Sequence, residues 1–283
     1  MNCLDGQITI CAATNGGGME FIMKKQENSG GYRSVQAVDR AIGILDYIAD
    51  HANSASIAEI CEGTSLNYST AYNLLRTLRM QDYVCQDFET GRFSIGPAIF
   101  KLSRAIKNSS SVTKEAIPEM RRLSEKYNET CQLGVLANNK LVYIGRVDCE
   151  REVRLASYIG KQIPPHMTSM GKALLAYLPE RERTLVVESL ELQMATPHTI
   201  TDRKVLYDEL ARIRQQGYAT DDEENVIGIH CFGAPVFDSR ARAVAAVSIV
   251  FLKERLSSAS TEEVIRDVKA TALDISRRLG YFS

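Results

Sequence analysis

Two stretches of the chain carry residue types that could recognise or transform another molecule. Between Tyr68 and Arg76, hydroxyl, amide and guanidinium side chains follow one another within a helical pattern. Hydroxyls donate to phosphate oxygens, asparagine pairs with adenine, and arginine pairs with guanine or phosphate. Further on, Ser169 and Lys172 have the S-x-x-K spacing of a nucleophilic serine and its lysine. The sequence therefore raises two chemistries, nucleic-acid recognition and acyl transfer.

The catalytic interpretation lacks its companion motifs. No K-T-G follows to complete an S-x-x-K site, and no G-x-S-x-G occurs. Gly171-Lys172 is not part of a phosphate-binding loop, because the first glycine is missing and Ala173 replaces the hydroxyl residue. The histidines at 51, 166, 198 and 230 do not have metal-ligand spacings. We therefore expect no enzyme, metal or cofactor; the alternative is a hydrolase or acyl-transfer enzyme that uses Ser169 and Lys172.

Composition bounds the class of protein. The 283 residues favour two domains or one large one, and 45% hydrophobic with 24% charged residues is a globular balance. The net charge of −1 gives no uniformly basic surface, although it is compatible with a local basic patch. The best apolar run, 243–252, is half of the roughly 20 residues that span a bilayer. Seven scattered cysteines fit free thiols. We expect a cytoplasmic protein without membrane contact.

Residues 33–96 have the pattern of three helices and a hairpin. The first helix is expected to start after Ser34 as N-cap, with an inward stripe that includes Val35, Val38, Ile42 and Ile48. Helices from Ser56 and from about Asn67 follow, and then two short strands around a turn that ends at Gly91. This is the outline of a winged helix-turn-helix, whose third helix enters the major groove. The candidate DNA contacts are Tyr68, Ser69, Thr70, Tyr72, Asn73, Arg76 and, at the hairpin tip, Arg92.

Helices and a hairpin of this kind also build protein-interaction modules. Residues 24–108 hold ten basic and nine acidic groups, so charge does not decide between the two. Composition and periodicity alone leave DNA binding and protein binding both open.

The rest of the chain divides into a tail, a linker and a second domain. Residues 1–32 are rich in glycine and are expected to form a flexible tail. A linker helix is expected over 97–111, and 112–283 mixes helices with strands that form antiparallel hairpins. This pattern indicates an α+β domain. The first helix and the linker helix, with Phe100 and Leu102, are the expected contacts of a dimer.

Several motifs, in a fixed order over residues 33–282, resemble the IclR family of transcriptional regulators. In the first half these are SVQAVDRA at 34–41, STAYNLLRTL at 69–78 and TGRFSIG at 90–96. In the second half they are PPHMTSMGKALLA at 164–176, GYATDDEE at 217–224, GIHC at 228–231 and APVFD at 234–238. The resemblance implies a winged helix joined by a linker helix to a GAF-like effector domain. It also implies a homodimer or homotetramer, often a repressor, that binds a double-stranded DNA operator.

The resemblance further implies a pocket for a small carboxylate effector. Its residues here are Met170, Gly171, Asp221, Cys231 and Ser248. The physics is coherent, because a helix N-terminus offers free N–H groups to a carboxylate and Ser248 adds a hydroxyl. Asp221 would repel that carboxylate, so we expect it at the neutral end of the ligand.

Three positions depart from the family pattern. The family commonly has Lys or Arg where this chain has Tyr68 and Asn73, which lowers the attraction of the third helix for phosphate. A second serine, common two residues after Ser248, is Val250 here. Operator and effector preference are therefore expected to differ from those of other members.

Overall fold

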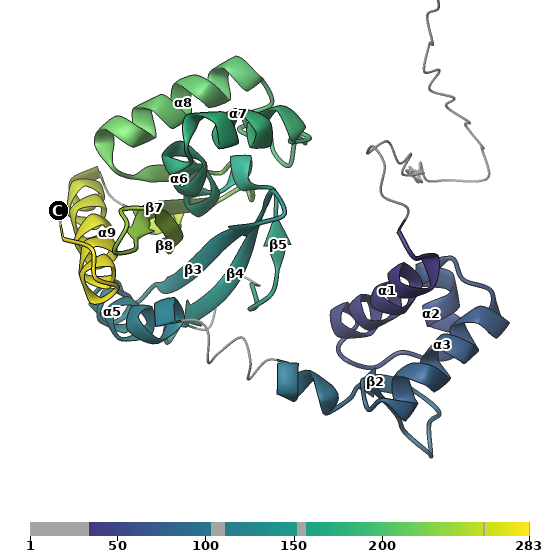
Figure 1. Ribbon diagram of the computed structural model, residues 1–283. Helices are drawn as coiled ribbons and strands as arrows, with labels where there is room; N and C mark the ends of the chain where they lie inside the picture. The colour runs from purple at the N-terminus through teal and green to yellow at the C-terminus, as the bar shows by residue number, and fades with distance from the viewer. Residues whose placement is uncertain (1–33, 103–110, 152–156, 257, 283) are drawn as a thin grey trace, which may run out of the picture. The chain divides into compact units, whose positions relative to one another are not determined.

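The computed structural model describes residues 34–102, 111–151, 157–256 and 258–282 (Figure 1). The chain separates into two compact units at Ile99–Phe100. The predicted tail over 1–32 lies outside the described residues, as do residues 103–110 of the predicted linker helix, whose residues 98–102 are helical. In the described part of the chain, no helix is long and apolar enough to cross a membrane.

The first unit is a winged helix-turn-helix, as the sequence predicts. Its elements are α1 Gln36–Asp50, α2 Ile57–Thr64, α3 Tyr68–Met80, β1 Val84–Gln86 and β2 Phe93–Ile95. The two strands are antiparallel, with Cys85 opposite Ser94. Ile44, Ile60 and Leu75, one from each helix, are buried together against the hairpin. This shared core fixes α3 relative to the hairpin.

Helix α1 differs from its prediction in two ways. Its N-cap is Val35 rather than Ser34, because the Ser34 hydroxyl donates to the Asp39 carboxylate at 2.5 Å and makes no cap bond. Ile44 and Ile48 are fully buried, but part of the expected inward stripe faces outward. The residues of that stripe that are more than half exposed are Val35, Val38 and Ile42.

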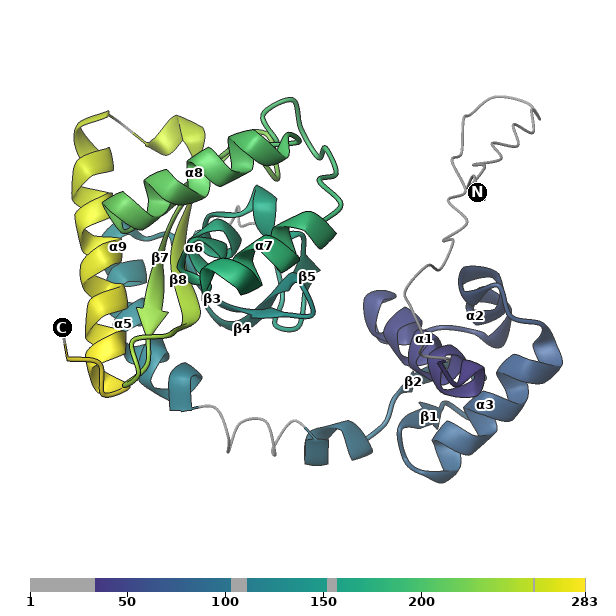
Figure 2. The ribbon, with the colours of Figure 1, turned by 45° about the horizontal axis from the view of Figure 1, so that its top comes forward.

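The second unit is built on one antiparallel sheet of six strands, in the order β5-β4-β3-β8-β7-β6 (Figure 2). The strands are β3 Thr130–Ala137, β4 Lys140–Val147, β5 Gln162–Ile163, β6 Ala219–Asp222, β7 Ile229–Phe237 and β8 Ala243–Leu252. The helices are α5 Ser111–Tyr127, α6 Ser169–Tyr177, α7 Glu180–Ser189, α8 Arg203–Gln216 and α9 Ser258–Arg278, with two short 3-10 turns, 165–167 and 253–255. The predicted α+β class is confirmed.

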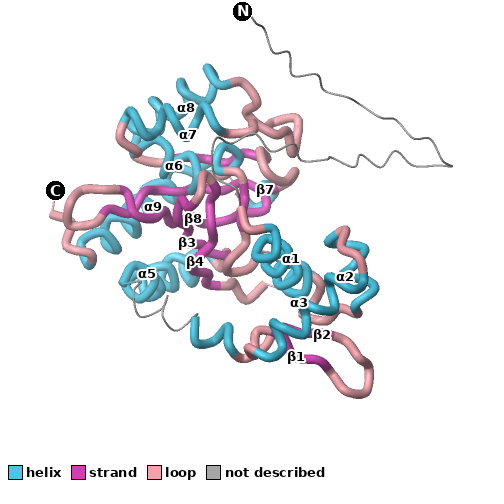
Figure 3. The backbone as a smooth tube through the Cα atoms, turned by 45° about the vertical axis from the view of Figure 1, so that its right-hand side comes forward, coloured by secondary structure: helices cyan, strands magenta, loops and turns pink. Residues whose placement is uncertain are grey.

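Helices cover both faces of this sheet (Figure 3). Helices α5 and α9 pack on one face, where Val247 and Ile249 of β8 meet Met120 and Val268. Helices α6, α7 and α8 belong to the core of the opposite face. Because side chains alternate along a strand, Ser248 faces away from the α5–α9 core. The sheet therefore presents one face to α6 and its neighbours.

Candidate functional site

The outer surface of α3 carries the predicted DNA-binding residues. Tyr68 and Tyr72 are 62% and 50% exposed, and their rings stack with centroids 6.3 Å apart. Asn73 and Arg76 are also exposed. Since residues three and four apart share a helix face, these side chains form one polar and aromatic strip.

Ser69 and Thr70 are partly engaged in the start of α3. The Asn67 side-chain oxygen accepts the Thr70 N–H at 2.9 Å and the Ser69 hydroxyl at 3.0 Å. Asn67 is thus the N-cap of the helix. The Ser69 hydroxyl keeps its acceptor capacity, while its hydrogen serves the cap.

Arg92 does not lie at the hairpin tip. Its guanidinium donates to the Ser54 hydroxyl at 2.8 Å, to the Ser54 carbonyl at 3.0 Å and to the Glu59 carboxylate at 2.8 Å. Glu59 also closes the capping box of α2. The tip is the turn 87–91, which the Asp87 carboxylate fixes by accepting two backbone N–H groups and where Phe88 is fully exposed. Arg92 therefore fastens the wing to α2, and its contact with DNA stays a prediction.

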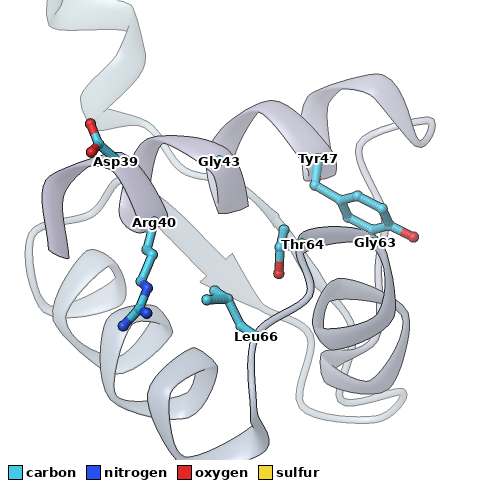
Figure 4. A pocket seen from close by; sticks show the side chains of 7 residues that line it. All are labelled: Asp39, Arg40, Gly43, Tyr47, Gly63, Thr64 and Leu66. Carbon is cyan, nitrogen blue, oxygen red and sulfur yellow. The ribbon is translucent and has the colours of Figure 1, made fainter. Parts of the chain in front are cut away.

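A surface pocket of about 380 Å³ lies between α1 and the α2–α3 turn (Figure 4). Its lining is Asp39, Arg40, Gly43, Tyr47, Gly63, Thr64 and Leu66. A Cβ added to Gly63 would lie 1.9 Å from the Tyr47 ring, so glycine is needed for this close approach. The pocket is the seam between these elements and contains none of the predicted site residues.

In the second unit, the sheet register brings three predicted effector residues together. Asp221 on β6 pairs with Cys231 on β7, which pairs with Val250 on β8. In the next row Gly233 pairs with Ser248. Residues two apart on a strand share a face, so these five residues lie on the face opposite to α5 and α9. Asp221, Cys231 and Ser248 are all buried.

The N-terminus of α6 lies directly on this face. A Cβ added to Gly233 would be 2.9 Å from the Ser169 hydroxyl and 3.1 Å from the Met170 nitrogen. Because Gly233 has no side chain, the start of α6 can lie against the row of the sheet that contains Ser248. The first N–H groups of a helix have no intrahelical acceptor and carry the positive end of its dipole. The Met170 N–H is therefore a suitable donor for an anion here.

Gly171 takes part in the cap of α6, and its contact with an effector stays a prediction. Its N–H donates to the Thr168 hydroxyl at 3.0 Å, which makes Thr168 the N-cap of α6. A Cβ at Gly171 would come within 2.3 Å of the Pro165 carbonyl oxygen. Gly171 therefore allows the turn 165–167 to pack on α6, and its N–H is engaged in the cap.

A buried charge cluster lies beside the site. Lys172 on α6 is 1% exposed, and its ammonium is ion-paired with the Glu224 carboxylate. Glu209 on α8 lies 3.8 Å from the same nitrogen and is also paired with Arg212. Glu224 retains one buried oxygen, Oε2, without a hydrogen-bond partner in the described part of the chain. The cluster joins α6, α8 and the β6–β7 loop.

Asp221 is bonded to the same loop. Its Oδ1 accepts the N–H groups of Glu224 at 2.8 Å and Asn225 at 3.4 Å. Burial, with the nearby charge of Glu224, raises the pKa of Asp221 to about 7. Burial and the adjoining Asp221 also raise the pKa of the Cys231 thiol, to which Asp221 is hydrogen-bonded. Asp221 is therefore a carboxyl group that readily holds a proton near neutral pH.

The sequence reasoning missed two polar residues of this face. Gln132 on β3 pairs with Ser248 and with Arg146 on β4, which extends the row across the sheet. Gln132 donates to the Ser157 hydroxyl at 2.7 Å, and Arg146 donates to the same hydroxyl at 2.9 Å. The only sequence signal was a polar residue, Gln132, inside an otherwise apolar strand. The sequence does not show which strands pair with it. Arg146 brings a cation to the edge of the candidate site.

The proposed serine–lysine pair of a hydrolase does not form here. The Lys172 nitrogen meets the Glu224 and Glu209 carboxylates, whereas the Ser169 hydroxyl faces Gly233. His166 is fully buried, with Nε2 3.1 Å from the Gln193 carbonyl. Within the described ranges, no cluster of His, Cys, Asp or Glu could hold a metal ion. The arrangement brings backbone donors, hydroxyls and carboxyls together on one buried face of the sheet.

Comparison with known proteins agrees with this arrangement. Residues 37–87 match the IclR helix-turn-helix domain, and 104–277 match the bacterial transcriptional regulator IclR C-terminal domain. These two domains define a helix-turn-helix transcriptional regulator. The HTH-type transcriptional repressor AllR of Salmonella typhi is 36% identical over 251 residues, which cover 88% of this chain and 91% of that protein. The chain belongs to the IclR family.

Further relatives share nearly their whole length with this chain. The HTH-type transcriptional regulator XynR of Escherichia coli K12 is 32% identical over 87% of this chain and 98% of its own. The crystal structure of the Thermotoga maritima IclR has a TM-score of 0.71 at 32% identity, over 86% and 98% of the two chains. An IclR homologue from Microbacterium hydrocarbonoxydans, solved with 4-hydroxybenzoate, has a TM-score of 0.74 at 21% identity, over 86% and 99%. XynR is thus a transcriptional regulator that resembles this chain over nearly its whole length, and the two solved structures share the chain's fold.

Proposed function

We propose that the chain is a repressor that binds its operator through α3 and changes its DNA affinity when a small carboxylic acid binds the second unit. The observation that carries the proposal is the meeting of the α6 N-terminus with Ser248 and Asp221 on one buried face. A helix N-terminus attracts an anion, and a buried hydroxyl adds a directed donor. The acid's carboxylate binds the Met170 N–H and Ser248, with Asp221 and Cys231 completing the site.

The operator is read by the exposed strip of α3. Asn73 is suited to adenine and Arg76 to guanine or phosphate, while Tyr68, Thr70 and Tyr72 supply hydroxyl donors for the phosphate backbone. Ser69, whose hydrogen is bonded to Asn67, supports the start of the helix at this surface. Arg92 contributes by holding the wing on α2, and its 38% exposed side chain can share a phosphate. Because α3 has few cations, base contacts and shape carry a large share of the specificity. The protein acts in the cytoplasm, where its operator is.

A homodimer or homotetramer best explains the exposed apolar residues of α1 and of the helical residues 98–102. Val35, Val38 and Ile42 leave an exposed stripe on α1, and Phe100 and Leu102 are 78% and 47% exposed. A second copy of the chain would bury these residues and match a near-palindromic operator. Light scattering at micromolar concentration tests this: a monodisperse monomer would exclude it.

The chain has no catalytic role in this proposal. The nearest enzymatic alternative uses Ser169 and Lys172, and Lys172 is committed to Glu224. Incubation with activated esters, followed by mass spectrometry of the intact protein, should show no acylated Ser169.

The effector site is tested by melting curves with pyruvate, lactate and 4-hydroxybenzoate, the last being the acid in the Microbacterium structure. An acid at 100 times its Kd stabilises the folded state by about 2.7 kcal/mol, which is a rise of roughly 5 °C for a domain of this size. Ser248→Ala should lose most of that rise. Ser276→Ala, which removes a buried serine on α9 on the opposite face of the sheet, is the matched control and should keep it. Equal shifts in both variants would place the pocket elsewhere.

A further inference from the structure

The buried carboxyl groups near the effector site outnumber their cations. Glu224 is paired with Lys172, and Glu209 is paired with Arg212. Asp221 is 3% exposed, and among the described residues it forms no ion pair. An unpaired buried carboxylate is costly, and such a group neutralises itself by taking a proton.

The titratable groups around Asp221 leave this imbalance in place, and the cation of Arg146 at the edge of the site is already paired with Asp148. Glu224 in its own loop adds negative charge, and Lys172 on α6 offsets it through their ion pair. From the neighbouring strands, Cys231 on β7 and Tyr143 on β4 contribute neutral groups whose pKa values are raised by burial. The next residue, Asp222, points to the other face and is paired with Lys253 instead.

The geometry also fixes which oxygen can carry the proton. Oδ1 of Asp221 accepts two backbone N–H groups, so its lone pairs are used. The hydrogen therefore belongs on Oδ2. A carboxyl O–H is a donor, whereas a carboxylate only accepts hydrogen bonds. The sequence-based expectation that Asp221 avoids the ligand's carboxylate assumed an ionised side chain.

We propose that Asp221 enters the effector complex as a neutral acid and donates its hydrogen to the effector's carboxylate, so that the anion binds together with one proton. The proton comes from water whenever Asp221 is ionised in the free protein, and it stays on Asp221 in the complex. Lys172 acts as the positioning residue, because it keeps Glu224 paired and leaves Asp221 without a cation. This inference rests on the proposed effector function of the site.

The test is calorimetric titration with pyruvate, lactate and 4-hydroxybenzoate, whose carboxyl groups stay ionised between pH 6 and 8. Two buffers of different ionisation enthalpy give the number of protons taken up. For a group that must be protonated and titrates near pH 7, the affinity should fall about tenfold from pH 6 to pH 8. Proton uptake should be near one at pH 8 and near zero at pH 6.

Three variants separate Asp221 from its neighbours. Asp221→Asn keeps a neutral donor, so it should bind equally well at both pH values, about tenfold tighter than wild type at pH 8. Glu224→Gln removes the charge that disfavours ionisation of Asp221, so the pH midpoint of binding should move down. The matched control Asp222→Asn should keep the wild-type profile.

Each other result overturns the inference. Wild-type binding with no pH dependence and no proton uptake would refute the role of Asp221 while leaving the effector site standing. A wild-type pH profile in Asp221→Asn would place the proton on another group. If none of the acids binds at either pH, the proposed function fails and the inference fails with it.

Discussion

Replacing Lys172 by methionine tests the charge cluster that supports the effector site. The ammonium is 1% exposed and meets Glu224 and Glu209. Methionine has nearly the same length but offers no charge, so Glu224 would be left buried without its cation. Breaking one side of a buried ion pair costs about 3–5 kcal/mol. For a domain of this size, each kcal/mol lowers Tm by roughly 2–4 °C, so we expect a fall of about 10 °C.

Scanning calorimetry measures this fall in Tm, and two further variants test whether it comes from the buried ion pair. Lys253→Met is the control, because Lys253 also pairs with two carboxylates but is 44% exposed. An exposed pair contributes about 0–1 kcal/mol, so Tm should change little. The double variant Lys172→Met with Glu224→Met replaces the pair by apolar side chains and should recover most of the lost stability.

The reasoning is refuted if Lys172→Met costs no more than Lys253→Met. It is also refuted if the double variant is less stable than Lys172→Met alone, because the loss of stability would then not come from burying Glu224 without its cation.

Three other outcomes are expected. Gly233→Ala adds a Cβ about 3 Å from Ser169 and Met170, so the acid-induced rise in Tm should disappear while operator binding in gel shifts is kept. Burial holds the pKa of Asp221 at about 7 against an ordinary 3.8, so the free energy of unfolding of the wild type should fall as the pH rises from about 4 to 8, by up to about 4 kcal/mol. Urea titrations of Asp221→Asn should not show that fall. Arg76→Ala should lower the salt slope of operator binding by about one per lost phosphate contact, and an unchanged slope would remove Arg76 from the phosphate interface.

Periodicity and capping predicted most of the fold. The starts of α2 and α3 follow from Ser56 and Asn67, because short polar side chains satisfy the free N–H groups of a helix start. Strand β8 coincides with the apolar run 243–252, because an apolar run of this length between turns is characteristic of a buried strand. The start of α1 was wrong, since Ser34 bonds Asp39, a competition that local spacing does not reveal.

The site was harder to predict because its geometry depends on pairing between distant strands. Gln132 lies beside Ser248 through the β3–β8 register, although 116 positions separate them in the chain. The role of Gly171 depends on Pro165 reaching within contact distance, and the position of Arg92 depends on Ser54 and Glu59. Family motifs could name candidate residues, while their hydrogen-bond partners required three-dimensional contacts.

The charge state of Asp221 could not be predicted from the run of acidic residues around it. Four consecutive acids at 221–224 are usually a solvated surface, but the strand places alternate residues on opposite faces. Asp221 is buried, whereas Asp222 is exposed and paired with Lys253. Burial rather than composition therefore determines the pKa of this carboxyl group.

The central claim is that an acid bound between the α6 N-terminus and Ser248 controls operator binding. The most direct measurement uses an operator that the wild-type protein selects from random DNA. Fluorescence anisotropy of this operator is followed as protein is added, and the titration is repeated at increasing concentrations of an acid that raises Tm. The account predicts that the acid changes operator affinity in wild type, and that Ser248→Ala binds the operator equally well without acid yet no longer responds to it. A full response by Ser248→Ala would contradict the account.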